Sequence, residues 1–148
     1  MKKGFTLIEL LIVMVVLGVL VTVALPKYRA SMERGRSVEG INNLRSASDH
    51  ANALYIMQGN AYPTYYSDKS LIGEDLTKNI HFNGVTVFEK SATTVTFQTT
   101  RPDLYTLRAE NKDGELLRIT CTPVSDPSEC TNIGMEDSGG ILMMKFAK

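Results

Sequence analysis

The sequence predicts an α+β protein in which one long N-terminal α-helix packs on a small antiparallel β-sheet head. Three features predict it: a nearly unbroken apolar run at residues 5–25, a helical repeat of apolar side chains that continues to Met57, and short β-rich segments beyond residue 84. The chain has 148 residues. Roughly 90 of them follow the long helix, which is enough for one modest head with a thin core.

The apolar run is just long enough to cross a membrane, because a hydrocarbon core of ~30 Å takes ~20 apolar residues as a helix. Glu9 lies one helical turn inside its N-terminal end. An ionisable side chain there costs ~2.5–3.5 kcal/mol unless it has a partner, so it indicates a function. A plain single-pass anchor leaves Glu9 unexplained. A secretory signal peptide, with Lys2 and Lys3 as its basic start and cleavage near Ala24, has a shorter and uninterrupted apolar segment.

The opening residues resemble the prepilin leader of the type IV pilin family, which includes the pseudopilins. The motif covers Lys2 to Glu9, with Gly4 directly before Phe5, and the apolar pattern extends the likeness to Tyr28. The resemblance implies the pilin fold and a leader peptide at residues 1–4. It also implies that a prepilin peptidase cuts after Gly4 and that the new Phe5 amine is N-methylated.

The same resemblance implies a role for the acid. Residues 5–26 would be a hydrophobic helix that lies in the membrane and then packs in the core of a filament. Glu9 would pair there with the positively charged Phe5 amine of a neighbouring subunit, or of its own chain. Two unit charges ~4 Å apart attract by about 4 kcal/mol at an effective dielectric constant of ~20, which offsets the burial. The alternative is a carboxylate that reaches back to the lipid head groups.

Two residues are predicted weak points of this helix. Pro26 removes a backbone donor, and Gly18 is a poor helix former. The family resemblance implies that residues 18–26 lose helix when the subunit assembles. An unbroken helix in the free subunit fits the sequence equally well.

Residues 27–58 are predicted to be the amphipathic half of the same helix. Gly59 and Asn60 form a stop signal, so one helix of roughly 80 Å should run from Phe5 to about Met57. Apolar or small side chains recur every three or four residues, as one buried helix face requires. They are Val38, Ile41, Leu44, Ala47 or Ser48, Ala51, Leu54 and Met57.

Residues 59–148 are predicted to form the head. An irregular connection comes first, with a short turn of helix at 71–76 and with Tyr62, Tyr65 and Tyr66 as packing residues. Three or four antiparallel strands would then lie across the amphipathic half of the helix. The β-rich segments are 85–88, 94–99, 104–108 and 116–121, with a hairpin turn at 111–114 and a terminal strand at 141–146.

Cys121 and Cys130 are the only cysteines, and we expect them to form a disulfide. No Cys-x-x-Cys or histidine spacing suggests a metal site, although two free thiols would fit the count. For a chain sent across the membrane, an oxidising compartment favours the bridge. A disulfide-closed C-terminal loop would also match the pilin family. Four acids surround this loop, and their spacing matches no EF-hand, so we expect a solvated loop instead of a Ca²⁺ site. They are Asp126, Glu129, Glu136 and Asp137.

The sequence does not indicate an enzyme, and we expect no cofactor and no metal. The only histidines are His50, expected as a surface or packing residue of the helix, and His81 in the connection. The chain has no glycine-rich phosphate loop, no nucleophile elbow and no metal-binding His/Glu helix. The formal net charge is +0, and no clustered basic face points to a nucleic acid.

Charge around the apolar run bears on topology. Four cations follow the run and only Lys2 and Lys3 precede it, which by the positive-inside rule would place the head in the cytoplasm. We expect the opposite orientation, because long domains cross the membrane largely regardless of flanking charge and the cysteine pair suits an oxidising side. The four cations are Lys27, Arg29, Arg34 and Arg36.

These observations predict a structural subunit of a type IV pilus. It would be held in the inner membrane with its head outside the cytoplasm and would then enter an extracellular filament. Its partners would be further copies, a prepilin peptidase, the inner-membrane assembly machinery and, before assembly, lipid. One alternative is a pseudopilin of a type II secretion system, but major pseudopilins usually have a Ca²⁺-bound loop where this chain has its cysteine pair. Another is a membrane-anchored binding protein that does not polymerise.

Overall fold

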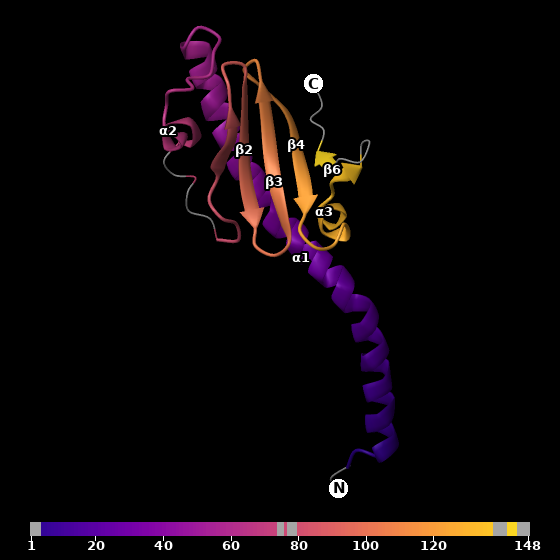
Figure 1. Ribbon diagram of the computed structural model, residues 1–148. Helices are drawn as coiled ribbons and strands as arrows, with labels where there is room; N and C mark the ends of the chain where they lie inside the picture. Colours follow the sequence, from indigo (N-terminus) through magenta and orange to yellow (C-terminus); the bar gives the residue numbers. More distant parts are fainter. Residues whose placement is uncertain (1–3, 74–75, 77–79, 138–141, 145–148) are drawn as a thin grey trace.

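The computed structural model describes residues 4–73, 76, 80–137 and 142–144 and has two layers, one helix and one sheet. Helix α1 (Leu7–Met57) packs with its C-terminal half against the sheet, and its N-terminal half projects from the head alone (Figure 1). The predicted α+β architecture is therefore confirmed.

Helix α1 begins two residues later than predicted, because Thr6 has extended backbone angles and serves as its N-cap. It passes through Pro26 without a break. It ends at Met57, as predicted. Gly59 and Asn60 there adopt φ values of 75° and 65°, and the Asn60 amide donates a hydrogen bond to the Tyr55 carbonyl oxygen at 3.0 Å. A glycine in this conformation is a common helix terminator.

Helix α2 (Asp68–Ile72) lies earlier in the connection than the predicted 71–76. Ser67 sets its start, since the Ser67 hydroxyl oxygen accepts a hydrogen bond from the Ser70 amide at 3.3 Å. Gly73, with a φ of 88°, ends it. This N-cap was not predicted, although serine is a common residue at that position.

All four predicted central strands are present, and each is longer than predicted. The β3–β4 connection shows why: only Asp113 and Gly114 form the turn, with φ values of 52° and 84°, so the polar residues on either side belong to the strands. Such two-residue turns match the twist of a hairpin. The strands are β1 (Thr86–Lys90), β2 (Thr94–Arg101), β3 (Tyr105–Lys112) and β4 (Glu115–Pro123).

Two short strands extend the sheet beyond the three or four that we predicted. After α3 (Ser128–Asn132) come β5 (Glu136–Asp137) and β6 (Leu142–Met144), which give the order β1-β2-β3-β4-β6-β5 with antiparallel neighbours. The predicted terminal strand at 141–146 is thus confirmed for residues 142–144, and its remaining residues lie outside the described part of the chain.

The core lies between the sheet and the C-terminal half of α1. Alternate residues of β2 and β3, such as Phe97 and Leu107, are fully buried against that helix face. The prediction of the buried face is wrong for two residues, because Val38 is 50% exposed and Met57 is 79% exposed. Gly40 packs there instead, and a Cβ on it would lie 2.8 Å from the Phe82 ring. The buried residues of α1 are Ser37, Gly40, Ile41, Leu44, Ala47, Ser48, Ala51 and Tyr55.

Candidate functional site

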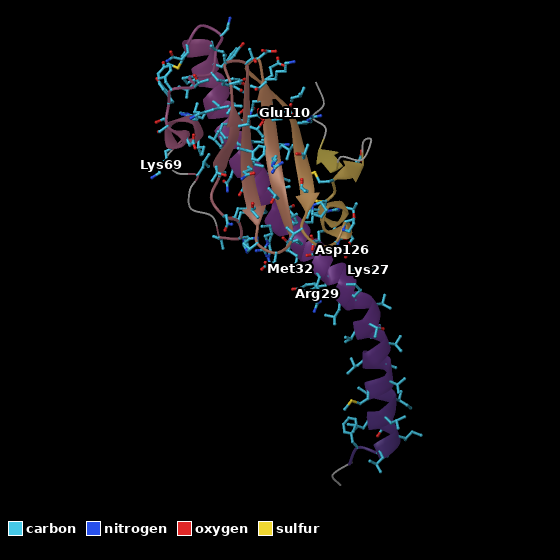
Figure 2. The ribbon with its side chains drawn as sticks, viewed as in Figure 1. Lys27, Arg29, Met32, Lys69, Glu110 and Asp126 are labelled. Carbon is cyan, nitrogen blue, oxygen red and sulfur yellow. A yellow bond between two sulfur atoms is a disulfide. The ribbon has the colours of Figure 1, made fainter. Side chains whose placement is uncertain are left out.

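The stem, defined here as residues 5–29, has every side chain exposed in the isolated molecule. Leu7 is 89% exposed and Leu17 is 53% exposed, and Figure 2 shows apolar side chains on all sides of the helix. By length and composition α1 can cross a membrane. Its most apolar stretch of 18 residues has no buried residue in the molecule. Soluble monomers rarely expose so large an apolar surface. The stem therefore needs lipid or other protein around it.

A capping box closes the tip of the stem. The Thr6 amide and the Thr6 hydroxyl both donate to Glu9 Oε2, at 2.9 and 2.8 Å, and the Glu9 amide donates back to the Thr6 hydroxyl oxygen at 3.4 Å. This arrangement satisfies backbone groups that the first helical turn leaves open. The capping box was not predicted, although Thr-x-x-Glu before an apolar run is its usual signature.

The Gly4–Phe5 junction is accessible. Gly4, Phe5 and Thr6 precede the helix, Phe5 is 85% exposed, and no atom lies within 4 Å of where a Gly4 Cβ would be. The backbone at this junction is therefore non-helical and can be reached from outside. Residues 1–3 of the expected leader lie outside the described part of the chain.

The predicted weak points lie within continuous helix. No atom lies within 4 Å of a Cβ built on Gly18, and Pro26 is inside α1. Proline has no amide hydrogen, so the Thr22 carbonyl oxygen lacks its helical donor. The Thr22 hydroxyl donates to the Val19 carbonyl oxygen at 2.8 Å, so this polar side chain is satisfied within the helix.

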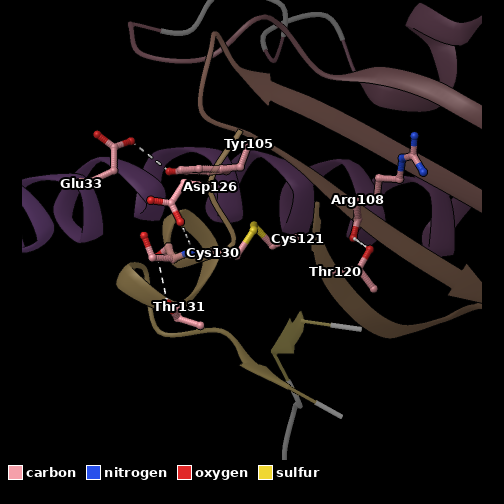
Figure 3. Close-up of a disulfide and its surroundings, with 9 residues drawn as sticks. Glu33, Tyr105, Arg108, Thr120, Cys121, Asp126, Cys130 and Thr131 are labelled. Atoms are coloured by element: carbon pink, nitrogen blue, oxygen red, sulfur yellow. Dashed lines mark hydrogen bonds between the residues drawn. A yellow bond between two sulfur atoms is a disulfide. The ribbon is translucent and has the colours of Figure 1, made fainter. Parts of the chain in front are cut away.

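A partly buried ion pair fixes the head to α1 where the stem ends. Glu33 Oε1 accepts hydrogen bonds from Arg101 Nε at 2.9 Å and from the Tyr105 hydroxyl at 3.0 Å (Figure 3 shows the Tyr105 contact). Partial burial alone would raise the pKa of Glu33, but these two hydrogen bonds hold it below its ordinary value. Burial, reinforced by the Glu33 charge, raises the pKa of Tyr105. Glu33 is therefore ionised and Tyr105 remains the donor.

A second acidic residue of α1 holds the connection. Glu39 Oε2 lies 2.7 Å from His81 Nδ1, and its Oε1 accepts from the Ile80 amide at 2.6 Å. Arg101 joins the two contacts, because its Nη1 donates to the His81 carbonyl oxygen at 2.9 Å. Although desolvation opposes it, hydrogen bonding from His81 and Ile80 lowers the pKa of Glu39. The contact between His81 and Glu39 was not predicted, because the two residues are 42 positions apart in the chain.

The predicted Cys121–Cys130 disulfide is formed, with Cα atoms 5.9 Å apart. It joins β4 to α3, and Cys130 is fully buried (Figure 3). The bridge closes the loop at 122–129, most of which is exposed, as expected. The bridge does not lie at a free sheet edge, because β6 pairs with β4 opposite Cys121.

Other predicted residues have mixed outcomes. Tyr62 is buried, its hydroxyl donates to Asn52 Oδ1 at 2.8 Å, and burial raises its pKa to about 12. Tyr66 is partly buried against the core, whereas Tyr65 is 75% exposed and packs on the Tyr66 ring, with the ring centroids 4.9 Å apart. His50 is a surface residue whose ring lies 3.1 Å from the Ser70 carbonyl oxygen.

The acids near the disulfide are the residues that were expected to form a solvated loop. Among the described residues, no group of three or more His, Cys, Asp or Glu side chains could hold a metal ion. Asp126 Oδ1 accepts a hydrogen bond from the Ser128 amide at 2.8 Å, and this contact lowers the pKa of Asp126. Glu129 is half-buried on α3 and Glu136 is exposed.

Known proteins resemble this chain in sequence. Residues 1–25 match the family model of the prokaryotic N-terminal methylation motif. The fimbrial protein EcpC of Eikenella corrodens is 39% identical over 70 residues, which is 47% of this chain and 39% of the relative. The type II secretion system core protein G of Pectobacterium carotovorum subsp. carotovorum is 36% identical over 66 residues, 43% of this chain and 40% of the relative.

A third relative is the type IV major fimbrial protein FimA of Dichelobacter nodosus, 43% identical over 42 residues, 28% of this chain and 26% of the relative. The chain therefore spans less than half the length of each of these curated relatives. No solved structure matches the chain. The N-terminal segment thus matches the methylation motif, and the exposed apolar stem and α+β head form a pilin-like architecture.

Proposed function

We propose that the chain is a structural subunit of a type IV pilus, which assembles through its stem into a cell-surface filament. The observation that supports this most is the stem itself, an apolar helix with no partner in the described part of the chain. The fimbrial relatives and the methylation motif support the same function. Its role is mechanical, so we propose that it is not an enzyme.

Processing comes first. We propose that a prepilin peptidase cuts between Gly4 and Phe5 and that the new Phe5 amine is methylated. The exposed, non-helical backbone at this junction supports cleavage there. The mature subunit then stays in the inner membrane as a single span, with its head outside the cytoplasm, where an oxidising compartment sustains the Cys121–Cys130 bridge.

Assembly moves the stem from lipid into a packed core of stems. Backbone hydrogen bonds are satisfied within the helix in both surroundings, so the transfer does not require unfolding. Contacts between different faces of successive copies do not close, and such contacts generate filaments. Gly18 and Pro26 are the points where we propose that the helix opens on assembly, because each weakens it locally.

Glu9 sets the register. In the precursor its Oε2 takes both Thr6 donors, and among the described residues its Oε1 has no hydrogen-bond partner. We propose that this oxygen receives the Phe5 amine of a neighbouring copy. Thr6 thereby orients the carboxylate before the neighbour arrives. In an apolar surrounding the charged pair is stable only in the correct register, since an unpaired charge there is costly.

A pseudopilin of a type II secretion system is a second candidate, favoured by the match to a secretion core protein G. The Cys121–Cys130 bridge supports the pilus instead, because the family resemblance implies a Ca²⁺-bound loop at this place in major pseudopilins. The two candidates share processing and assembly and differ in where the filament lies.

The experiment compares cells with and without the gene for this chain. Filaments sheared from the surface should contain the chain, and electron microscopy should show that they are lost on deletion and restored by the wild-type gene. Mass spectrometry of the sheared material should find a chain that starts at a methylated Phe5. A filament confined to the periplasm would favour the pseudopilin. An uncut Met1, or a terminus at Leu25, would contradict both candidates.

A further inference from the structure

The junction of stem and head contains charges of both signs that are not paired. A groove of about 850 Å³ lies there, between residues 25–36 of α1 and the end of the head nearest the stem. Glu33 inside it is neutralised by Arg101. Arg29 and Asp126 also line the groove, yet among the described residues neither has an opposite charge within 4.0 Å (Figure 2 labels both).

Glu129 on α3 makes the head side of the groove more acidic. It lines the groove beside Asp126, and its Oε2 is buried with no hydrogen-bond partner in the described part of the chain. A buried carboxylate oxygen that gives up water without gaining a donor destabilises the molecule. Glu129 also has no ion pair among the described residues, so it adds negative charge to the wall that Asp126 begins.

The spacing of residues along α1 indicates where a cation could come from. Phe5 and Glu9 are four residues apart, and so are Arg29 and Glu33. If the Phe5 amine of the next copy lies level with Glu9, that copy is displaced by about 6 Å along the axis. The same displacement brings its Arg29 level with Glu33, and thus with the groove, because all copies share one conformation in the filament. The residue spacing sets the position of Arg29 along the filament axis. Asp126 and Glu129 extend sideways from the head at that position.

We propose that Arg29 of one copy binds the acidic wall formed by Asp126 and Glu129 on the head of a neighbouring copy. The proposal rests on the proposed function and adds a second contact to the Glu9 register. A guanidinium suits this role because it donates two parallel hydrogen bonds to a carboxylate. Such charge pairs mainly fix register and partner. Before assembly, an anionic lipid head group is the competing ligand for Arg29.

Charge reversal in the full-length chain tests the pairing. Arg29→Glu and Asp126→Arg, each as the only subunit, should lower the yield of sheared filaments by at least about tenfold, because attraction becomes repulsion. Co-production of the two variants should restore filaments. In alternating copies the introduced carboxylate of one variant then meets the introduced guanidinium of the other, and the unchanged Arg29 meets the unchanged Asp126. The chain with both reversals should also assemble.

Co-production separates a contact between copies from one within a copy. If the doubly reversed chain assembles but the mixture does not, the pair lies within one chain and the proposal is wrong. Wild-type yields from both single reversals, or loss only from Arg29→Glu as lipid binding would give, contradict it too. Lys69→Glu, an exposed charge reversal on α2, is the matched control and should not change the yield.

Two further measurements keep the test decisive. Non-reducing gels should show equal amounts of each precursor with its disulfide formed. If a reversed chain does not accumulate, Arg29→Gln and Asp126→Asn replace the pair and should each reduce the yield, whereas unchanged yields would contradict the proposal. Filaments from wild type that lack this chain altogether would contradict the proposed function itself.

Discussion

One helix serves two different surroundings in this molecule. From Ser37 onward, α1 buries small and apolar side chains against the sheet, whereas the stem exposes residues that are more apolar still. The C-terminal half of α1 has small and apolar residues on the face that packs on the sheet. Its other face is polar because that face is solvated. The stem is apolar on every side, which is typical of a helix that is surrounded by lipid or protein. The comparison teaches that the head folds with its own residues and that the stem requires a partner outside the chain.

Removing the stem carboxylate should have the largest effect, and only on assembly. Glu9→Leu loses the proposed partner of the Phe5 amine but keeps an apolar helix, so cleavage and membrane insertion should be normal while filaments are almost absent. Electron microscopy and immunoblots of membrane fractions measure the two outcomes. Normal filaments from Glu9→Leu as the only subunit would refute the register role.

A leucine pair separates the two halves by stability. Leu44 is fully buried, and Leu44→Ala should lower the free energy of unfolding of the head by about 2–5 kcal/mol, through lost contacts and a cavity. Leu17→Ala in the stem should change it by less than about 0.5 kcal/mol. Denaturation of both variants in detergent, followed by circular dichroism, makes the comparison. Equal effects would mean that the stem also packs on the head.

The disulfide should matter for the head alone. The loop from Cys121 to Cys130 has ten residues, so its removal by Cys121→Ser with Cys130→Ser should cost roughly 2.5–3 kcal/mol on the chain-entropy model. The same denaturation assay measures this, with reduced wild-type protein as the control. A stability within about 0.5 kcal/mol of the oxidised protein would show that the loop is held without the bridge.

Acid should weaken the contact between head and α1. The folded-state pKa of Glu33 lies below its unfolded value of about 4.3, so its stabilisation is complete above that pH and is lost as pH falls through the folded pKa. The melting temperature should thus fall below about pH 4, and less steeply in Glu33→Gln. Glu115→Gln, an exposed residue of β4, should keep the wild-type profile. Identical profiles for all three proteins would remove Glu33 from the account.

Local signals in the sequence predicted the elements well, since each was encoded within a few residues. The helix end at Gly59–Asn60 and the four central strands are of this kind. Contacts between distant segments could not be predicted. Tyr55, for example, faces the sheet because it packs on Tyr62 and on the β3–β4 turn at Gly114.

The candidate site divides in the same way. The tip motif at residues 4–9 is contiguous and was recognised, although its capping box was overlooked. The Glu33–Arg101 pair joins residues 68 positions apart, and only the fold brings them together. Val38 was misplaced because an apolar side chain on a partly covered helix fits the repeat even where the sheet does not reach it.

Electron cryomicroscopy of filaments made from this chain alone tests the central claim most directly. The account predicts stems packed together at the filament centre, heads outside, and Glu9 within hydrogen-bond distance of the Phe5 amine of a neighbouring copy. Filaments held together by their heads, with stems apart from one another, would contradict it.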